Sequence, residues 1–110
     1  MDLVEYYEYS ADKDQPSTLQ LLGQIFYEGY NETPVDYVQA RSYFEKAVEQ
    51  GAVASNGFLG EIYLFGLGVE RDTSKAFRYF REAAQSGSSM GNNGLGVLYR
   101  DGIEVLADQE

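Results

Sequence analysis

The chain has 110 residues, 44% of them hydrophobic, which is enough for one small domain with a core of its own. Its 18 acidic and 8 basic residues give a net charge of −10, and a surface this acidic repels nucleic acids and anionic membranes. Cysteine and histidine are both absent, which excludes disulfides, thiolate metal sites and the commonest general base. The sequence also shows no membrane-spanning apolar run and no signal-peptide pattern.

Apolar residues recur with helical periodicity along the chain and predict a series of helices. The expected ranges are 2–13, 17–28, 37–50, 53–65, 73–86 and 89–101. In the fifth range, Ala76, Tyr79 and Phe80 begin a stripe with the i, i+3, i+4 spacing of one helix face. The sequence therefore predicts an all-α fold.

Two of these helices begin with residues that are typical of helix caps. Ser17 followed by Gln20 fits a capping box, in which each side chain binds the backbone N–H of the other residue. Asp36 followed by Gln39 fits a looser version of the same motif. Both pairs predict a helix start.

The helices form a repeat. Residues separated by 36 or 37 positions and therefore equivalent are Gly23, Gly60 and Gly96; Gly29, Gly66 and Gly102; Tyr6, Tyr43 and Tyr79; Tyr7, Phe44 and Phe80; Gly51 and Gly87. Two complete units span 15–51 and 52–87, residues 1–14 correspond to the second helix of a truncated unit, and 88–110 to a first helix plus a tail. One unit alone cannot bury its apolar stripe, so the period predicts an α-solenoid of stacked helix-turn-helix repeats.

The glycines of the repeat have two predicted roles. Glycine inside a helix costs about 1 kcal/mol relative to alanine, so Gly23, Gly60 and Gly96 indicate close approach of a paired helix. We expect a large aromatic side chain of that helix to lie against each of them. Gly66 and its equivalents are expected to end the first helices, and Gly68 to serve a local turn.

Three short motifs resemble catalytic or phosphate-binding sequences without the context that the chemistry needs. GSSMG places Ser89 as the nucleophile of an elbow that requires a preceding strand and a histidine. SADK, residues 10–13, fits S-x-x-K, but Ser10 takes a packing position that alanine holds in later units. FGLGVERD, residues 65–72, lacks the third glycine of a dinucleotide site and the lysine of a P-loop. We therefore expect no catalytic residue and no cofactor; the enzymatic alternative is a hydrolase using carboxylates or Ser89.

The unit LGEIYLFGLGVERDTSKAFRYFREAAQSG resembles the Sel-one-like repeat, a helical hairpin of the tetratricopeptide superfamily. The resemblance covers two full units and partial ones at either end, residues 3–105. It implies a right-handed α-solenoid that holds other proteins and performs no catalysis. The first unit departs from the pattern with the loop YNETPVDY, and Asp14 stands where later units have glycine.

Within this family, DLVEYYEYSADKDQPSTLQLLGQIFYEG and MGNNGLGVLYRDGIEV are similar to luminal adaptors of ubiquitin ligases in endoplasmic-reticulum-associated degradation. That similarity implies three kinds of partner, namely the ubiquitin ligase, lectins and misfolded glycoprotein clients. It also implies that a full-length parent, of which the chain is a segment, lies in the lumen of the endoplasmic reticulum. The alternative is a bacterial or cytosolic signalling scaffold, located in the cytosol or the bacterial periplasm.

The sequence suggests residues for a glycan site, a partner surface and a self-association end. The triplet Asn31-Glu32-Thr33 is an N-x-T acceptor in an expected loop and predicts a glycan on Asn31.

First helices line most of a solenoid's concave face. The candidate partner surface from these helices is Glu28, Glu61, Leu64 and Arg100. The expected self-association end, which would be partly exposed and favour a homo-oligomer, is Leu95, Leu98, Ile103, Val105 and Leu106.

Overall fold

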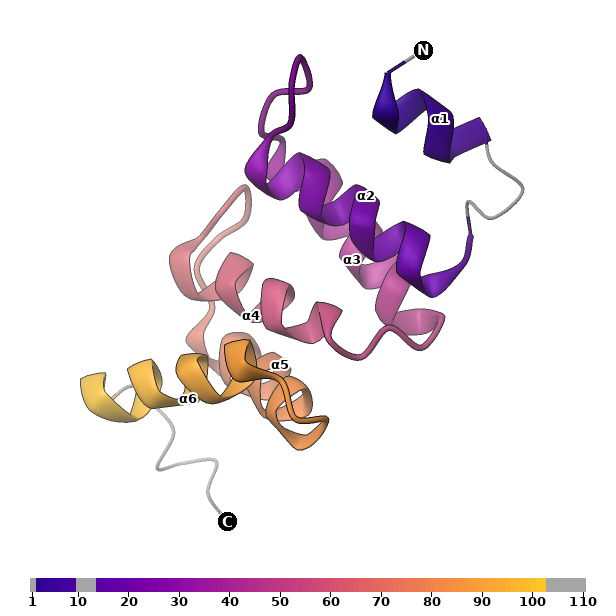
Figure 1. Cartoon of the computed structure of the whole chain (residues 1–110). Helices are drawn as coiled ribbons and strands as arrows, with labels where there is room; N and C mark the ends of the chain where they lie inside the picture. Colours follow the sequence, from indigo (N-terminus) through magenta and orange to yellow (C-terminus); the bar gives the residue numbers. More distant parts are fainter. Residues whose placement is uncertain (1, 10–13, 103–110) are drawn as a thin grey trace. The chain divides into compact units, whose positions relative to one another are not determined.

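The computed structural model describes residues 2–9 and 14–102, and these residues form helices and turns without a β-strand. The helices of this part of the chain are α1 (Leu3–Tyr9), α2 (Pro16–Glu28), α3 (Tyr37–Glu49), α4 (Ser55–Phe65), α5 (Thr73–Gln85) and α6 (Ser89–Asp101) (Figure 1). Every predicted helix is present, so the all-α class is confirmed. The S-x-x-K motif at 10–13 lies outside the described residues.

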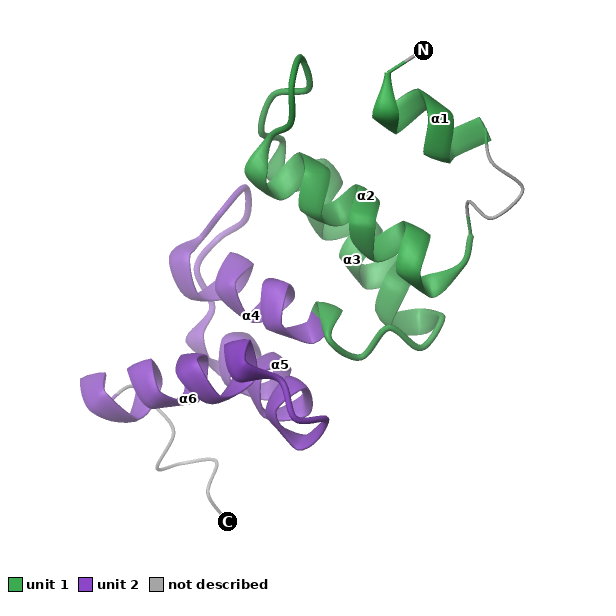
Figure 2. Cartoon of the chain, viewed as in Figure 1, with its two compact units in different colours: residues 1–55 green, residues 56–110 purple. Residues whose placement is uncertain are grey.

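The chain divides into two compact units, residues 1–55 and residues 56–110 (Figure 2). In the first unit α2 packs along α3, and α1 touches α2 more sparsely. In the second unit α5 packs along α6, and α4 contacts α5 through Gly60 and Tyr63. Each unit thus contains helices of more than one sequence repeat.

The second helices of the two complete repeats, α3 and α5, each begin at an aspartate cap. Asp36 accepts a hydrogen bond from the backbone N–H of Gln39 at 3.1 Å, which confirms the predicted cap of α3. Asp72 caps α5 in the same way. The capping box at Ser17 is wrong, because α2 begins one residue earlier at Pro16, after Gln15. Proline fixes φ near the helical value and has no N–H to satisfy, so it starts the helix in place of a side-chain cap.

A phenylalanine ring lies against the mid-helix glycine in each complete repeat. A Cβ atom on Gly23 would lie 2.7 Å from the Phe44 ring, and one on Gly60 would lie 2.6 Å from the Phe80 ring. Both phenylalanines are buried. The predicted close approach is therefore confirmed at these two glycines, since any larger residue would displace the ring.

Gly96 was predicted to make the same contact, and this prediction is wrong. A Cβ atom there would meet no atom of the described residues within 4 Å. In each complete repeat the glycine faces the second helix of its own repeat, and no second helix follows α6 among the described residues. Two other glycines of α6 contact α5 instead: Gly94 lies against the Phe80 ring, and Gly91 lies against the α5 backbone.

A stacked aromatic pair recurs one residue before each of these phenylalanines. The rings of Phe26 and Tyr43 stack with centroids 5.8 Å apart and planes at 4°. Tyr63 and Tyr79 stack at 5.7 Å and 11°. Phe26 and Tyr63 are 37 positions apart and Tyr43 and Tyr79 are 36 apart, so the repeat conserves this contact.

The turn between the helices of each repeat needs left-handed backbone. Gly66 ends α4 with φ of 67°, and its equivalents Gly29 and Gly102 also have positive φ, which confirms the predicted helix stops. Gly68 has φ of 69°, and Asn31, at the same position in the first repeat, has φ of 53°. Asparagine is among the few other residues that adopt this conformation readily.

Candidate partner-binding surface

Leu64 does not belong to an exposed partner surface, and this part of the prediction is corrected. Its side chain is buried in the core of the second unit together with Phe77 and Phe80 of α5. Leu64 lies on the side of α4 that faces α5, because it follows Gly60 by one helical turn. It therefore stabilises the fold and cannot contact a partner from this position.

The other three predicted contact residues lie on three different helices. Glu28 is exposed at the end of α2, whereas Glu61 is half-buried in α4. Arg100 is exposed on α6 and forms an ion pair with Asp101 at 3.2 Å. An exposed pair of this kind contributes little to stability, so the Arg100 guanidinium remains available to a ligand.

A groove of about 340 Å³ lies between α1 and α2 in the first unit. Its walls are mainly apolar, from Leu3 and Tyr7 on α1 and Leu21 and Ile25 on α2. Gln24, Glu28, Gly29 and Tyr30 complete the lining. The groove thus combines an apolar wall with one carboxylate, that of Glu28.

The sequence explains why α1 and α2 leave this space. Leu21 holds the position in α2 that Gly94 holds in α6. Glycine at 94 lets α6 approach the Phe80 ring closely, whereas the leucine side chain at 21 keeps α1 at a greater distance. Thr18 likewise stands in α2 at the position where α6 has the smaller Gly91. Comparing these small residues between repeats would have indicated the groove from sequence.

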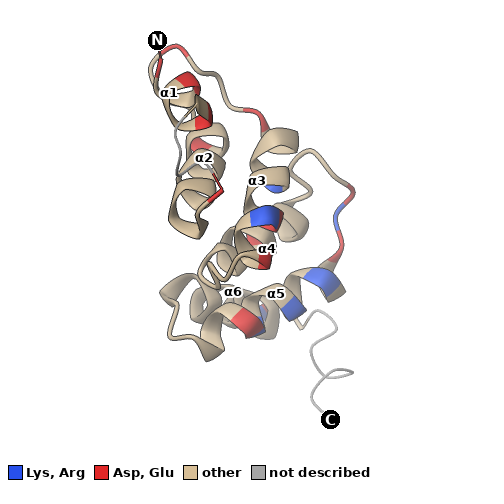
Figure 3. Ribbon diagram, turned by 90° about the vertical axis from the view of Figure 1, so that its right-hand side faces the viewer, with Lys and Arg blue, Asp and Glu red and all other residues tan. Residues whose placement is uncertain are grey.

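The second unit carries a charged groove of about 320 Å³. It is lined by Asn56, Lys75, Arg78, Tyr79 and Glu82. Basic residues gather along α5 (Figure 3), and the ammonium of Lys75 lies 5.1 Å from the centroid of the Tyr63 ring. This groove offers cations on a chain that is acidic overall.

A tyrosine and a carboxylate link α1 to α3. The hydroxyl of Tyr43 donates a hydrogen bond to the Glu8 carboxylate. Burial, and then this hydrogen bond and the negative charge of Glu8, raise the pKa of the Tyr43 hydroxyl well above its ordinary value. The hydroxyl therefore stays protonated at neutral pH and acts as a structural donor.

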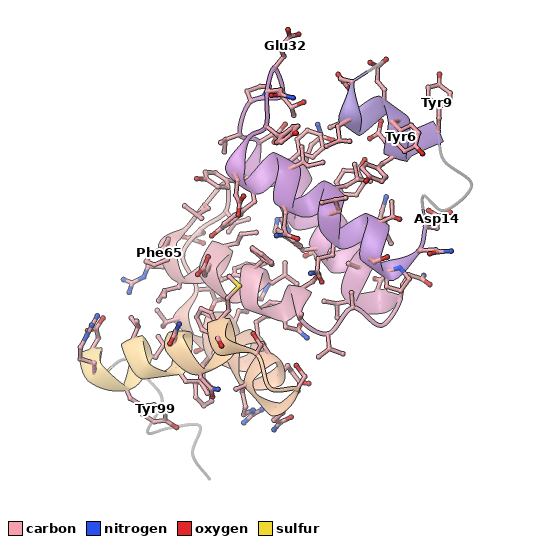
Figure 4. All side chains as sticks on the ribbon, in the orientation of Figure 1. Tyr6, Tyr9, Asp14, Glu32, Phe65 and Tyr99 are labelled. Carbon is pink, nitrogen blue, oxygen red and sulfur yellow. The ribbon has the colours of Figure 1, made fainter. Side chains whose placement is uncertain are left out.

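The predicted acceptor Asn31 lies in a tight turn. The backbone N–H and C=O groups of Tyr30 and Thr33 bond to each other across it, at 2.9 and 2.8 Å. Asn31 and Glu32 are exposed at its tip, as Figure 4 shows for Glu32. A glycan on Asn31 stays a prediction, and its side chain is sterically open to one.

The predicted self-association end is only partly as expected. Leu98 was expected to be partly exposed, but it is fully buried against the α5 core, because α6 turns this face toward α5. Leu95 is partly buried beside the same core. Ile103, Val105 and Leu106 lie outside the described residues. The exposed aromatic residue on α6 is Tyr99, which was not among the predicted residues.

Ser89 lacks the surroundings of a nucleophile. It is the first residue of α6, directly after the cap Ser88, and helix α5 precedes it where an elbow needs a strand.

Within 2–9 and 14–102, no three acidic side chains are grouped so that they could hold a metal ion. In the same part of the chain, none of the helices has the length and apolar character to cross a membrane.

The chain is thus a helical-repeat protein, and comparison with known proteins defines the class. The family model of the Sel1 repeat matches residues 17–51, 54–88 and 89–110. The chain belongs to the Sel1 repeat family. Proteins of this family are all-α solenoids of helical repeats and are generally non-catalytic scaffolds for protein–protein interactions.

Two solved structures from bacteria are similar to the chain. One is a protective antigen of uropathogenic Escherichia coli strains with an SLR fold, at 31% identity and a TM-score of 0.79 over 93% of this chain. The other is a Sel1 repeat protein from Oxalobacter formigenes, at 25% identity and a TM-score of 0.76 over 91% of this chain. The chain spans 22% and 40% of the lengths of these proteins. No curated protein matches it.

Proposed function

We propose that the chain is a protein-binding segment of a larger adaptor and that the groove between α1 and α2 holds a segment of its partner. The groove is the observation that carries this proposal, because it is a concave apolar surface on a member of a family of protein-binding scaffolds. Residues 1–55 contain ten acidic and three basic residues, a net charge of −7. The partner segment therefore combines apolar side chains with basic ones.

The adaptor that we propose acts in endoplasmic-reticulum-associated degradation. There it links a ubiquitin ligase to lectins and misfolded glycoproteins from the luminal side. The similarity of residues 2–29 and 90–105 to such adaptors supports this function, and so does an acceptor asparagine exposed in a tight turn. A bacterial scaffold is the second candidate, and the bacterial origin of both solved structures favours it.

Expression in a secretory pathway tests whether the Asn31 acceptor is used. Expressed behind a secretory leader in eukaryotic cells, the chain is expected to carry one glycan on Asn31, because the acceptor is exposed. Peptide N-glycosidase should then increase its gel mobility, and both Asn31→Gln and Thr33→Ala should abolish the difference. Asn92→Gln, an exposed asparagine outside any acceptor triplet, is the control. An unmodified chain would favour the bacterial or cytosolic scaffold.

A further inference from the structure

The charged groove of the second unit carries two cations without a counter-ion in the described part of the chain. Lys75 and Arg78 of α5 line it together with Asn56, Tyr79 and Glu82. Both cations are exposed, and neither forms an ion pair with a described residue. We call this feature, defined by its five lining residues, the α5 groove.

The first repeat shows that helix packing does not require these two cations. Gln39 and Ser42 of α3 hold the positions of Lys75 and Arg78, and α3 packs along α2 with these uncharged side chains. Two like charges one helical turn apart also repel each other, so the pair slightly destabilises α5 itself. Cations that cost stability and serve no packing contact are typical of a binding surface.

Asn56 makes one wall of the α5 groove polar. It is the second residue of α4 and is 5% exposed, whereas its equivalent in the first repeat is the buried Leu19. A carboxamide has donors and an acceptor, as a peptide backbone does. The α5 groove therefore offers hydrogen bonds at a position where the first repeat offers an apolar side chain.

An aromatic pair positions one of the cations. The rings of Tyr63 and Tyr79 stack with centroids 5.7 Å apart, and the Lys75 ammonium lies 5.1 Å from the centroid of Tyr63. A ring face attracts a cation, so the lysine side chain is held beside the groove before a ligand arrives. Less side-chain entropy is then lost on binding.

The local charge selects an anionic ligand, although the whole chain has a net charge of −10. Residues 71–85 contain four basic residues and two acidic ones, Asp72 and Glu82. At physiological ionic strength the Debye length is about 8 Å, so more distant acids are largely screened. Glu82 lies about two helical turns from Lys75 and repels further anions. The groove therefore suits a few carboxylates better than a continuous polyanion.

We propose that the α5 groove binds an acidic segment of a protein partner, with side-chain carboxylates at Lys75 and Arg78. The polar wall at Asn56 lies beside the backbone of that segment. The ligand is opposite in charge to the basic and apolar segment proposed for the groove between α1 and α2. The two grooves share no residue, so the two proposals succeed or fail separately. An adaptor with both grooves joins two chemically different partners.

Fluorescence anisotropy of a labelled peptide tests the proposal on the unchanged chain. The probe is a capped peptide of alternating glutamate and alanine, and its counterpart has glutamine in place of every glutamate. At about 0.15 M salt the glutamate peptide is expected to bind about tenfold more tightly. Two exposed charge pairs give this difference, since each contributes up to about fivefold in affinity.

Three variants locate the binding site. Lys75→Gln and Arg78→Gln are each expected to weaken binding of the glutamate peptide by about three- to fivefold. Glu82→Gln removes the carboxylate that repels the peptide, so it should strengthen binding by about twofold. A gain in affinity does not arise from misfolding, and this variant therefore separates a direct effect on the groove from a structural one.

Arg81→Gln is the matched control. It makes the same change in charge on the same helix, but Arg81 does not line the groove, and its guanidinium lies 5.5 Å from the centroid of the Phe77 ring. Its affinity for the glutamate peptide should equal that of the unchanged chain. Helical circular dichroism of all four variants should also be unchanged, because the substituted side chains are exposed.

Any of three results would overturn the proposal. One is a glutamate peptide that does not bind, or binds no more tightly than the glutamine peptide. Another is an Arg81→Gln chain that loses as much affinity as the Lys75→Gln and Arg78→Gln chains, because net charge alone would then explain the binding. The last is tighter binding of a single-stranded DNA of the same charge, which would show a general polyanion surface.

Discussion

Replacing Phe80 by alanine is expected to lower the free energy of unfolding by about 3–5 kcal/mol. The side chain is 1% exposed, and its ring lies between Gly60 of α4 and Gly94 of α6. Glycines have no side chain that could move into the space of the lost ring, so the cavity would persist. Urea unfolding followed by circular dichroism measures this loss.

Phe65→Ala is the matched control for Phe80→Ala. It removes the same ring from a position that is 62% exposed at the end of α4. We expect a loss below about 1 kcal/mol, as for other surface positions. Equal losses for the two variants would contradict the central place of Phe80 in the core.

Replacing Gly91 by leucine is expected to cost about 3 kcal/mol, at the upper end for overpacked sites. A Cβ atom at Gly91 would overlap the backbone nitrogen of Ala84 and lie 2.7 Å from the carbonyl oxygen of Phe80. Backbone atoms of α5 cannot rotate away as a side chain can, so α5 and α6 would have to separate. Thermal unfolding should show a clear fall in Tm.

Gly96→Leu provides the comparison on the same helix. The new Cβ atom meets no atom of the described residues within 4 Å, and leucine favours a helix over glycine by up to about 0.8 kcal/mol. Its Tm should therefore stay the same or rise. If both leucine variants lost stability equally, the close contact at Gly91 would not be the cause.

The repeat period predicted most of the fold because it records contacts that recur. Gly23 and Gly60 were predicted correctly, since each complete repeat supplies the aromatic ring that needs a glycine opposite it. Gly96 was predicted wrongly because a period identifies equivalent positions and does not show whether the opposing helix is there. Gly91 and Gly94 were not selected because they do not recur as glycines.

The candidate surfaces were harder to predict than the helices. Leu64 has an arginine as its equivalent in α6, so sequence alone did not fix which side of the first helix faces α5. Leu98 was predicted to be partly exposed, but it is buried because α6 packs on α5, the second helix that precedes it. The groove between α1 and α2 arises from the size of Leu21 against α1, a steric effect that helical periodicity does not register.

Partner capture tests the central claim, that the chain binds protein through the groove between α1 and α2. A full-length parent with Leu21→Asp, which puts a charge into the apolar wall, is compared with one carrying Glu49→Lys at an exposed site of α3. Quantitative mass spectrometry of the proteins retained by each, and by the unchanged parent, is the measurement. We predict that Leu21→Asp loses a ubiquitin ligase or its clients selectively while Glu49→Lys retains them. Identical retention by all three parents would contradict the account.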